Sequence, residues 1–229
     1  MFGPLFPPAP AIPRLQYLRS LNGGGDFQTA GGLWQRLIGG AADSAENLVK
    51  PYGLAAADGK LFVCDSARGD VFFFDFARQS FGRWAHPGQR LSQPLGIRIT
   101  ETGLVEVCDV GLGAVVTFRA DGGLVGLVDL AVLRETTPSA SLPAAFRPVA
   151  SAGGPRGATA VLNAAAHRVE LIDPVGGRHL GSWSQPGSGA GDLYYPTAMT
   201  RADDGTLWIT DRLNRRLLAL GPDGRRVGG

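Results

Sequence analysis

The sequence predicts an all-β domain built from one repeated unit, and three observations support this prediction. Four short apolar runs each end on an acidic or amide residue, at Asp65, Asp109, Asn163 and Asp211. A second apolar run begins six residues after each of them, at Val71, Val115, Val169 and Leu217. A proline stands 14 or 15 residues before each of them, at Pro51, Pro94, Pro148 and Pro196. Two apolar runs joined by a short polar turn are typical of a β-hairpin, so the chain contains four hairpins of one length.

The spacing between the hairpins indicates the architecture. The steps from Asp65 to Asp109, to Asn163 and to Asp211 are 44, 54 and 48 residues. A repeat of about 40 to 50 residues that is rich in short strands is typical of propeller blades. We therefore predict a β-propeller of four-stranded antiparallel blades. The four blades are expected at about residues 51–83, 94–130, 148–184 and 196–229.

The strand that ends at Asp65 is apolar on both faces. Leu61 and Val63 point to one side of the sheet, whereas Phe62 and Cys64 point to the other. A strand of this kind is covered on both sides, as in a blade between two other blades. Asp-Gly pairs lie between the apolar runs, where a tight turn needs positive φ, at residues 58–59, 204–205 and 223–224.

The residues before the first blade follow a different pattern. Residues 1–14 contain five prolines and are expected to form an extended arm, because proline is excluded from helix interiors and central strands. Residues 15–21 are predicted to form a short strand without a hairpin partner beside it. Residues 31–38 have apolar side chains at helical spacing, which predicts a short helix packed on the domain, or alternatively one that docks a partner.

Composition excludes several classes of protein. The net charge is +2, and no run of 18 apolar residues is present, so no membrane span is predicted. The N-terminus shows no basic segment followed by an apolar one, so no secretory signal is predicted. The compartment stays open, and an exported or envelope location is compatible with an incomplete N-terminus.

The repeated motif resembles the NHL-repeat β-propellers over about residues 15–224. The resemblance is carried by Pro51-Tyr52-Gly53 with Val63-Cys64-Asp65, by Pro94-Leu95-Gly96 with Val107-Cys108-Asp109, by His167-Arg168-Val169 with Asp173, and by Pro196 with Asp211 and Asn214-Arg215-Arg216-Leu217. It implies six blades, of which this chain would supply about four. It also implies that the strand at 15–21 completes the last blade. We expect a truncated six-blade propeller that self-associates through exposed sheet faces, with a closed four-blade ring as the alternative.

The repeated carboxylates do not predict catalysis. Asp65, Asp109, Asn163 and Asp211 all precede a turn, so we expect them to accept hydrogen bonds from turn N–H groups. Cys64 and Cys108 occupy equivalent places in adjacent blades, about 10 Å apart, which is too far for a disulfide. The three histidines, His86, His167 and His179, do not share a register that would hold a metal. We predict no catalytic residue, metal or cofactor; Gly187-x-Gly189-x-Gly191 is expected to be a flexible connector.

The functional hypothesis rests on residues expected at one end of the propeller surface. The turns between second and third strands open on the same end as the segments that lead into first strands. That end would display Arg68, Arg90, Arg147, His167, Arg168, Tyr194, Tyr195, Arg212, Arg215 and Arg216, with Asp70 and Asp192 as the nearest carboxylates. Arginine with tyrosine is typical of protein and nucleic-acid contacts. The long connection at 131–147 is a further place for specificity, or a tolerated insertion.

Three functions fit this surface. The first hypothesis is a non-enzymatic scaffold that binds a protein or peptide on the arginine-rich end. The second is a propeller lyase or hydrolase with its site on the central axis. The third is binding of single-stranded RNA, which the nearly neutral charge disfavours because phosphate binding needs basic residues.

Overall fold

The computed structural model describes residues 5–6, 15–16, 19–27, 47–84, 90–129 and 146–227. The chain divides into two compact units, Met1–Leu48 and Val49–Gly229. Three features of the sequence prediction lie outside the described residues: the helix at 31–38, residues 131–145 of the long connection, and His86.

The first unit contains one short strand pair. β1 (Leu5–Phe6) pairs antiparallel with β2 (Leu15–Gln16), and a 3-10 turn, η1 (Gly24–Phe27), follows. The prediction that the strand over 15–21 has no hairpin partner is therefore wrong, because residues 15–16 pair with residues 5–6 of the proline-rich arm. Leu5 and Phe6 lie between Pro4 and Pro7 and keep their own N–H groups, so this is a place where the arm can pair.

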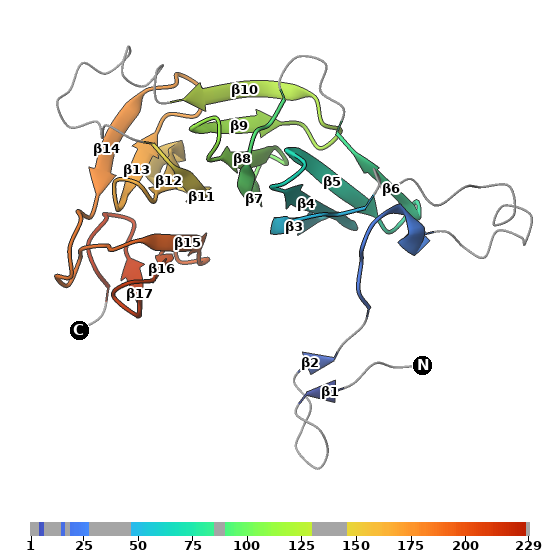
Figure 1. The fold of residues 1–229 in the computed structure, drawn as a ribbon. Helices are drawn as coiled ribbons and strands as arrows, with labels where there is room; N and C mark the ends of the chain where they lie inside the picture. Colours follow the sequence, from blue (N-terminus) through green and yellow to red (C-terminus); the bar gives the residue numbers. More distant parts are fainter. Residues whose placement is uncertain are drawn as a thin grey trace, which may run out of the picture. The chain divides into compact units, whose positions relative to one another are not determined.

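The second unit holds four antiparallel sheets, each built from consecutive strands (Figure 1). The first is β3 (Pro51–Ala57), β4 (Lys60–Asp65), β5 (Asp70–Asp75) and β6 (Ser80–Arg83). The second is β7 (Pro94–Ile99), β8 (Val105–Asp109), β9 (Ala114–Phe118) and β10 (Leu124–Asp129). The third is β11 (Pro148–Gly153), β12 (Thr159–Asn163), β13 (Arg168–Ile172) and β14 (His179–Trp183), with a short 3-10 turn, η3 (Pro155–Gly157), between its first two strands.

The fourth sheet has three named strands: β15 (Pro196–Arg201), β16 (Leu207–Asp211) and β17 (Arg216–Leu220). Residues beyond β17 turn back along its outer edge. Arg226 forms a bridge with Leu220, and the Val227 N–H donates to the Ala219 carbonyl at 2.9 Å. The last described residues therefore occupy the position of an outer strand.

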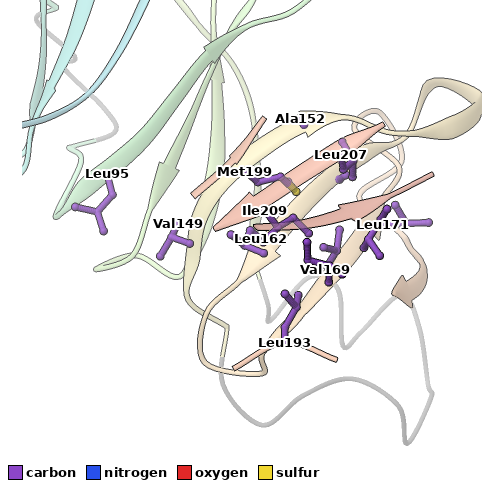
Figure 2. Close-up of a cluster of buried hydrophobic side chains, with 13 residues drawn as sticks. Leu95, Val149, Ala152, Leu162, Val169, Leu171, Leu193, Met199, Leu207 and Ile209 are labelled. Carbon is purple, nitrogen blue, oxygen red and sulfur yellow. The ribbon is translucent and has the colours of Figure 1, made fainter. Parts of the chain in front are cut away.

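The four sheets are blades of a β-propeller, which confirms the predicted fold class. Each blade packs on the next through its first strand, with β7 beside β3 and β11, and β11 beside β15. Apolar side chains fill the space between blades. The largest cluster lies between the third and fourth blades, where Leu162 and Val169 meet Met199 and Ile209 (Figure 2).

Two glycines allow the first strands to come this close. A Cβ added to Gly53 would lie 2.1 Å from the Leu95 carbonyl oxygen, and one added to Gly96 would lie 2.5 Å from the Val149 carbonyl oxygen. Both distances are far below van der Waals contact. The glycine of each Pro-x-Gly segment is therefore needed because the backbone of the following blade touches it.

The connector with three glycines is folded, contrary to its prediction as a flexible segment. The Leu193 N–H donates to the Gln185 carbonyl at 2.9 Å, and the Gly187 N–H donates to the Leu193 carbonyl at 3.1 Å. The Asp192 carboxylate accepts the Gly189 N–H at 3.0 Å. A Cβ at Gly187 would lie 2.5 Å from that carboxylate, so a larger residue there would displace the Asp192 side chain.

Candidate binding surface on the loop-bearing end

In each blade, the acidic or amide residue that ends the second strand accepts hydrogen bonds from neighbouring segments at one end of the blade. The buried Asp109 carboxylate accepts N–H groups from Ser92 and Gln93, which lead into β7, at 2.7 and 2.9 Å. It also accepts the Gly111 and Leu112 N–H groups of the following turn, at 2.9 and 3.0 Å. One carboxylate thus ties the turn to the segment that begins the same blade.

The same arrangement recurs in the first and third blades. Asp65 accepts the Lys50 N–H from the lead-in segment and the Ala67 and Arg68 N–H groups from the turn. The Asn163 Oδ1 accepts the Arg147 N–H at 3.0 Å, together with two N–H groups of its turn. These contacts are the ones expected for the repeated residues if they stabilise the fold rather than catalyse.

In the fourth blade, side chains supply part of the contacts to the equivalent carboxylate. Asp211 accepts the Tyr194 N–H of the lead-in segment at 2.7 Å. Its other partners are Asn214 Nδ2 at 2.7 Å and Arg216 Nε at 2.9 Å. Arg216 also donates to the carbonyls of Gly189 and Asp192, at 2.7 and 2.6 Å. Its guanidinium is therefore engaged within the fold.

These contacts define one end of the domain. Backbone bonds join each turn to its lead-in segment, as from the Val110 N–H to the Gln93 carbonyl and from the Leu213 N–H to the Tyr194 carbonyl, both at 3.1 Å. We call this the loop-bearing end; it comprises residues 49–50, 66–69, 90–93, 110–113, 146–147, 164–168, 192–195 and 212–216. The side chains that the sequence analysis assigned to a binding face all belong to it.

Three rings gather on this end, although they come from two blades. His167 lies in the turn of the third blade, and its ring is 5.3 Å from that of Tyr194 and 4.6 Å from that of Tyr195. The two tyrosine rings are 5.1 Å apart in an edge-to-face arrangement. Tyr194 is 42% exposed and Tyr195 50% exposed, so both present ring surface to solvent. The Nδ1 atom of His167 is buried and has no hydrogen-bond partner.

The backbone at this surface is strained. His167, Tyr195 and Arg215 have φ values of 53°, 52° and 53°, in the left-handed region that side chains with a Cβ disfavour. The turn positions of His167 and Arg215 correspond to Gly69 and Gly113 in the first two blades, which have φ values of 66° and 65°. Strain of this kind concentrates at functional sites, where the side chain is needed in spite of its cost.

The predicted arginines fall into two groups. Arg147, Arg212 and Arg215 are exposed, as is Arg90. Arg68 and Arg168 are half-buried, and the Nε of Arg168 lies 3.9 Å from Glu170. The structure brings the turn of Arg212 and Arg215 directly against Tyr194. Arg68 lies in the turn of the first blade, whereas the ring cluster comes from the third and fourth blades.

A buried Ser-His-Glu group in the third blade is not arranged as a nucleophilic triad. His179 Nε2 lies 2.9 Å from Glu170 Oε2 and 3.2 Å from Ser182 Oγ, so one ring nitrogen faces both partners. The Ser182 hydroxyl donates to the same carboxylate. In a triad the carboxylate and the hydroxyl bind opposite nitrogens of the ring. The group is instead a buried polar network, with Glu170 1% exposed.

The first strands of the four blades form a cleft whose residues were not among the predicted site residues. Residues of β3, β7, β11 and β15 line a cavity of about 610 Å³, and its charged side chains are Arg98, Glu101, Arg201 and Asp203. It reaches the turns between first and second strands, at the end opposite the ring cluster. Arg201 passes Gly153 and binds Glu101 at 3.3 Å. No local motif could reveal this site, because its walls are far apart in the sequence.

Other chemistry is limited in the described part of the chain. Cys64 and Cys108 are free and fully buried; burial raises the pKa of the Cys64 thiol well above its ordinary value and raises that of Cys108 to about 12. Among these residues no group of three or more His, Cys, Asp or Glu side chains could hold a metal ion. Nor does this part of the chain contain a helix that is long and apolar enough to cross a membrane.

The fold and its blade packing define a β-propeller protein, and comparison with known proteins agrees at the level of fold. The sequence matches no protein-family model and no curated protein. Among solved structures, it resembles virginiamycin B lyase from Staphylococcus aureus in complex with quinupristin. The TM-score is 0.60 and the identity 14%, over 81% of this chain and 56% of the lyase.

Two further structures show the same similarity. A streptogramin B lyase gives a TM-score of 0.60 at 15% identity, over 77% of this chain and 53% of the lyase. A chain of the nidogen/laminin complex gives 0.58 at 18% identity, over 84% of this chain and 68% of that one. The chain thus spans about half the length of the lyases. At these identities the likeness shows the shared fold alone.

Proposed function

We propose that this chain is an NHL-type propeller scaffold that binds a protein or peptide on its loop-bearing end. The observation that carries the proposal is the cluster of His167, Tyr194 and Tyr195, two of which hold left-handed backbone. Exposed tyrosines that are fixed by neighbouring rings offer large contact area at low entropic cost. Arg212 and Arg215 next to them supply charged hydrogen-bond donors, and tyrosine and arginine are the residues that dominate binding energy at interfaces.

The NHL assignment is part of this proposal. It is supported by the close approach at Gly53 and Gly96, which explains the Pro-x-Gly segments, and by the hydrogen bonds of Asp65 and Asp109, which explain the repeated aspartates. The chain of the nidogen/laminin complex has a similar fold and belongs to a complex of two proteins. That likeness is compatible with the proposed function and does not carry it.

The proposal is tested with peptides selected from a random phage library on the immobilised chain. Tyr195→Ala should lower the affinity for the selected peptides by 10-fold or more, because loss of a central aromatic contact costs about 2 kcal/mol. Val175→Ala is the matched control, since Val175 is 95% exposed and lies in a turn of the third blade outside the loop-bearing end. Equal binding by both variants would contradict the proposed surface.

Arg215→Gly gives a second, independent readout. Glycine relieves the left-handed strain that Gly69 and Gly113 avoid in the first two blades, so the free energy of unfolding should be unchanged or raised by up to about 1 kcal/mol. Peptide affinity should nonetheless fall. A variant that is less stable but binds normally would assign Arg215 to the fold and remove it from the site.

RNA binding is the outcome that would replace this proposal. Affinity for a single-stranded oligonucleotide should then fall steeply with salt, because phosphate contacts release counterions. Peptide binding through ring surface and two arginines should weaken much less over the range from about 50 to 200 mM salt, because it lacks a row of phosphate contacts. The salt dependence of each probe therefore distinguishes the two kinds of partner.

A further inference from the structure

The charged residues of the loop-bearing end are almost all cations. Its segments contain eight lysine or arginine residues and a single acidic one, Asp192. The Asp192 carboxylate is engaged within the fold, because it accepts the Gly189 N–H at 3.0 Å. Arg147, Arg212 and Arg215 are exposed, and none of the three takes part in an ion pair within the described part of the chain. A partner that reaches this end therefore meets unpaired guanidinium groups.

The repeat itself explains why carboxylates are scarce on this surface. Asp65, Asp109 and Asp211 end second strands at this end, yet all three are 0% exposed. Each accepts backbone N–H groups of the fold, and the third blade has the neutral Asn163 at the same position. These carboxylates cannot receive a cation from a partner because they are buried. The arginines of the adjacent segments, in contrast, remain in solvent.

Exposed charges at the other end of the blades lie in pairs of opposite sign. Arg119 Nε lies 3.6 Å from Asp121, and Arg178 Nη2 lies 3.2 Å from Asp173, in turns between third and fourth strands. The net charge of +2 is thus a sum over two unlike surfaces. Only the loop-bearing end offers several cations without matching exposed carboxylates among the residues that the structure describes.

The unpaired arginines flank the cluster of aromatic rings. In the third blade, the Arg147 carbonyl accepts an N–H at 3.0 Å from the turn that carries His167. In the fourth blade, the Leu213 N–H donates to the Tyr194 carbonyl at 3.1 Å, directly beside Arg212. Along this row of contacts, the rings lie between two segments that each carry an unpaired guanidinium.

We infer that the partner of this surface is an acidic peptide segment, an inference that rests on the proposed function. An apolar side chain of the peptide packs on the rings of Tyr194 and Tyr195, and carboxylates on either side of it bind Arg147 and Arg212. A guanidinium holds a carboxylate through two parallel N–H···O bonds, and such charged hydrogen bonds are about twice as strong as neutral ones. A basic peptide would place its cations beside arginines, and like charges at an interface reduce affinity.

The composition of selected peptides tests this inference first. Peptides selected from a random phage library on the full chain should be enriched in aspartate and glutamate over the unselected library. Replacing these residues by asparagine and glutamine in a selected peptide should lower its affinity about 10-fold or more, because the guanidinium groups lose their charged partners.

The response to Tyr195→Ala separates this inference from the proposed function. Neutral or basic peptides that bind less tightly to Tyr195→Ala would overturn the acidic preference and leave the proposed binding surface intact. Peptides that bind Tyr195→Ala as well as the wild-type chain would contradict the proposed function, and this inference with it.

Charge-removing variants then locate the carboxylate contacts by fluorescence anisotropy. Arg147→Gln and Arg212→Gln should each lower the affinity for the acidic peptide about 3- to 10-fold, and should leave that for its amide version unchanged. Arg156→Gln is the matched control, because Arg156 is exposed in the turn between β11 and β12, at the other end of the blades. Equal losses for both peptides, or tighter binding of a single-stranded RNA oligonucleotide that displaces the acidic peptide, would overturn the proposal.

Discussion

The residue that ends each second strand shows how one position adapts to its neighbours. The first, second and fourth blades have aspartate at this position, whereas the third blade has Asn163. The residue seven positions later is apolar in the other blades but is Glu170 in the third. Asn163 Nδ2 donates to Glu170 Oε1 at 3.4 Å, while Asn163 Oδ1 accepts the backbone N–H groups that an aspartate would accept. An amide serves both contacts, and a carboxylate would repel Glu170.

This relation predicts the behaviour of Asn163→Asp. The variant should be destabilised by about 1 to 3 kcal/mol at pH 7.5, because two carboxylates would meet in a buried site. Chemical denaturation at pH 7.5 measures it.

A double-mutant cycle supplies the control for this prediction. Glu170→Gln removes the repelling charge, so the double variant should recover part of the loss caused by Asn163→Asp. Penalties that simply add, with no recovery, would show that Glu170 is not the reason for asparagine at this position.

Sequence reasoning at this scale found the repeated position and its turn but not its partners. A carboxylate before a polar turn predicts hydrogen bonds to nearby N–H groups, and such bonds are present in the first two blades. The use of Asn214 and Arg216 around Asp211 was not predictable, because the same arginine also binds carbonyls of residues 189 and 192. That contact exists only once the connector has folded.

At the scale of elements, the glycines of the first strands set the distance between blades. Gly96→Ala should be destabilised by about 1 to 3 kcal/mol, because its Cβ would press on the backbone of the third blade. The matched control is Gly126→Ala. A Cβ at Gly126 would meet nothing within 4 Å, and its φ is not positive. Urea denaturation of the two variants checks this prediction, and equal stabilities would mean that the first strands can move apart freely.

Strand positions followed directly from the repeated apolar runs, whereas two other elements could not be predicted in this way. β1 and β2 pair over two residues each, and a segment of two residues is too short to show a pattern of apolar and polar side chains. The connector at 185–193 looked flexible from its glycines. Its order comes from Asp192, whose carboxylate accepts the Gly189 N–H, and from the backbone bonds that join Leu193 to Gln185 and Gly187.

At the scale of the whole domain, the chain presents two different surfaces at its two ends. The loop-bearing end has exposed aromatic rings and arginines. The opposite end opens the cleft of about 610 Å³, where Arg201 of the fourth blade reaches Glu101 of the second. The sequence predicted the first surface because its residues recur at fixed places in the repeat. The second surface depends on residues about 50 positions apart, which no local pattern connects.

The most direct test is to locate a selected peptide by amide hydrogen exchange on the wild-type chain. We expect slower exchange in the bound state at residues 164–168, 192–195 and 212–215, with the first strands unchanged. Protection confined to residues 97–101, 150–153 and 199–203 would instead place the ligand in the cleft and contradict the proposed binding surface.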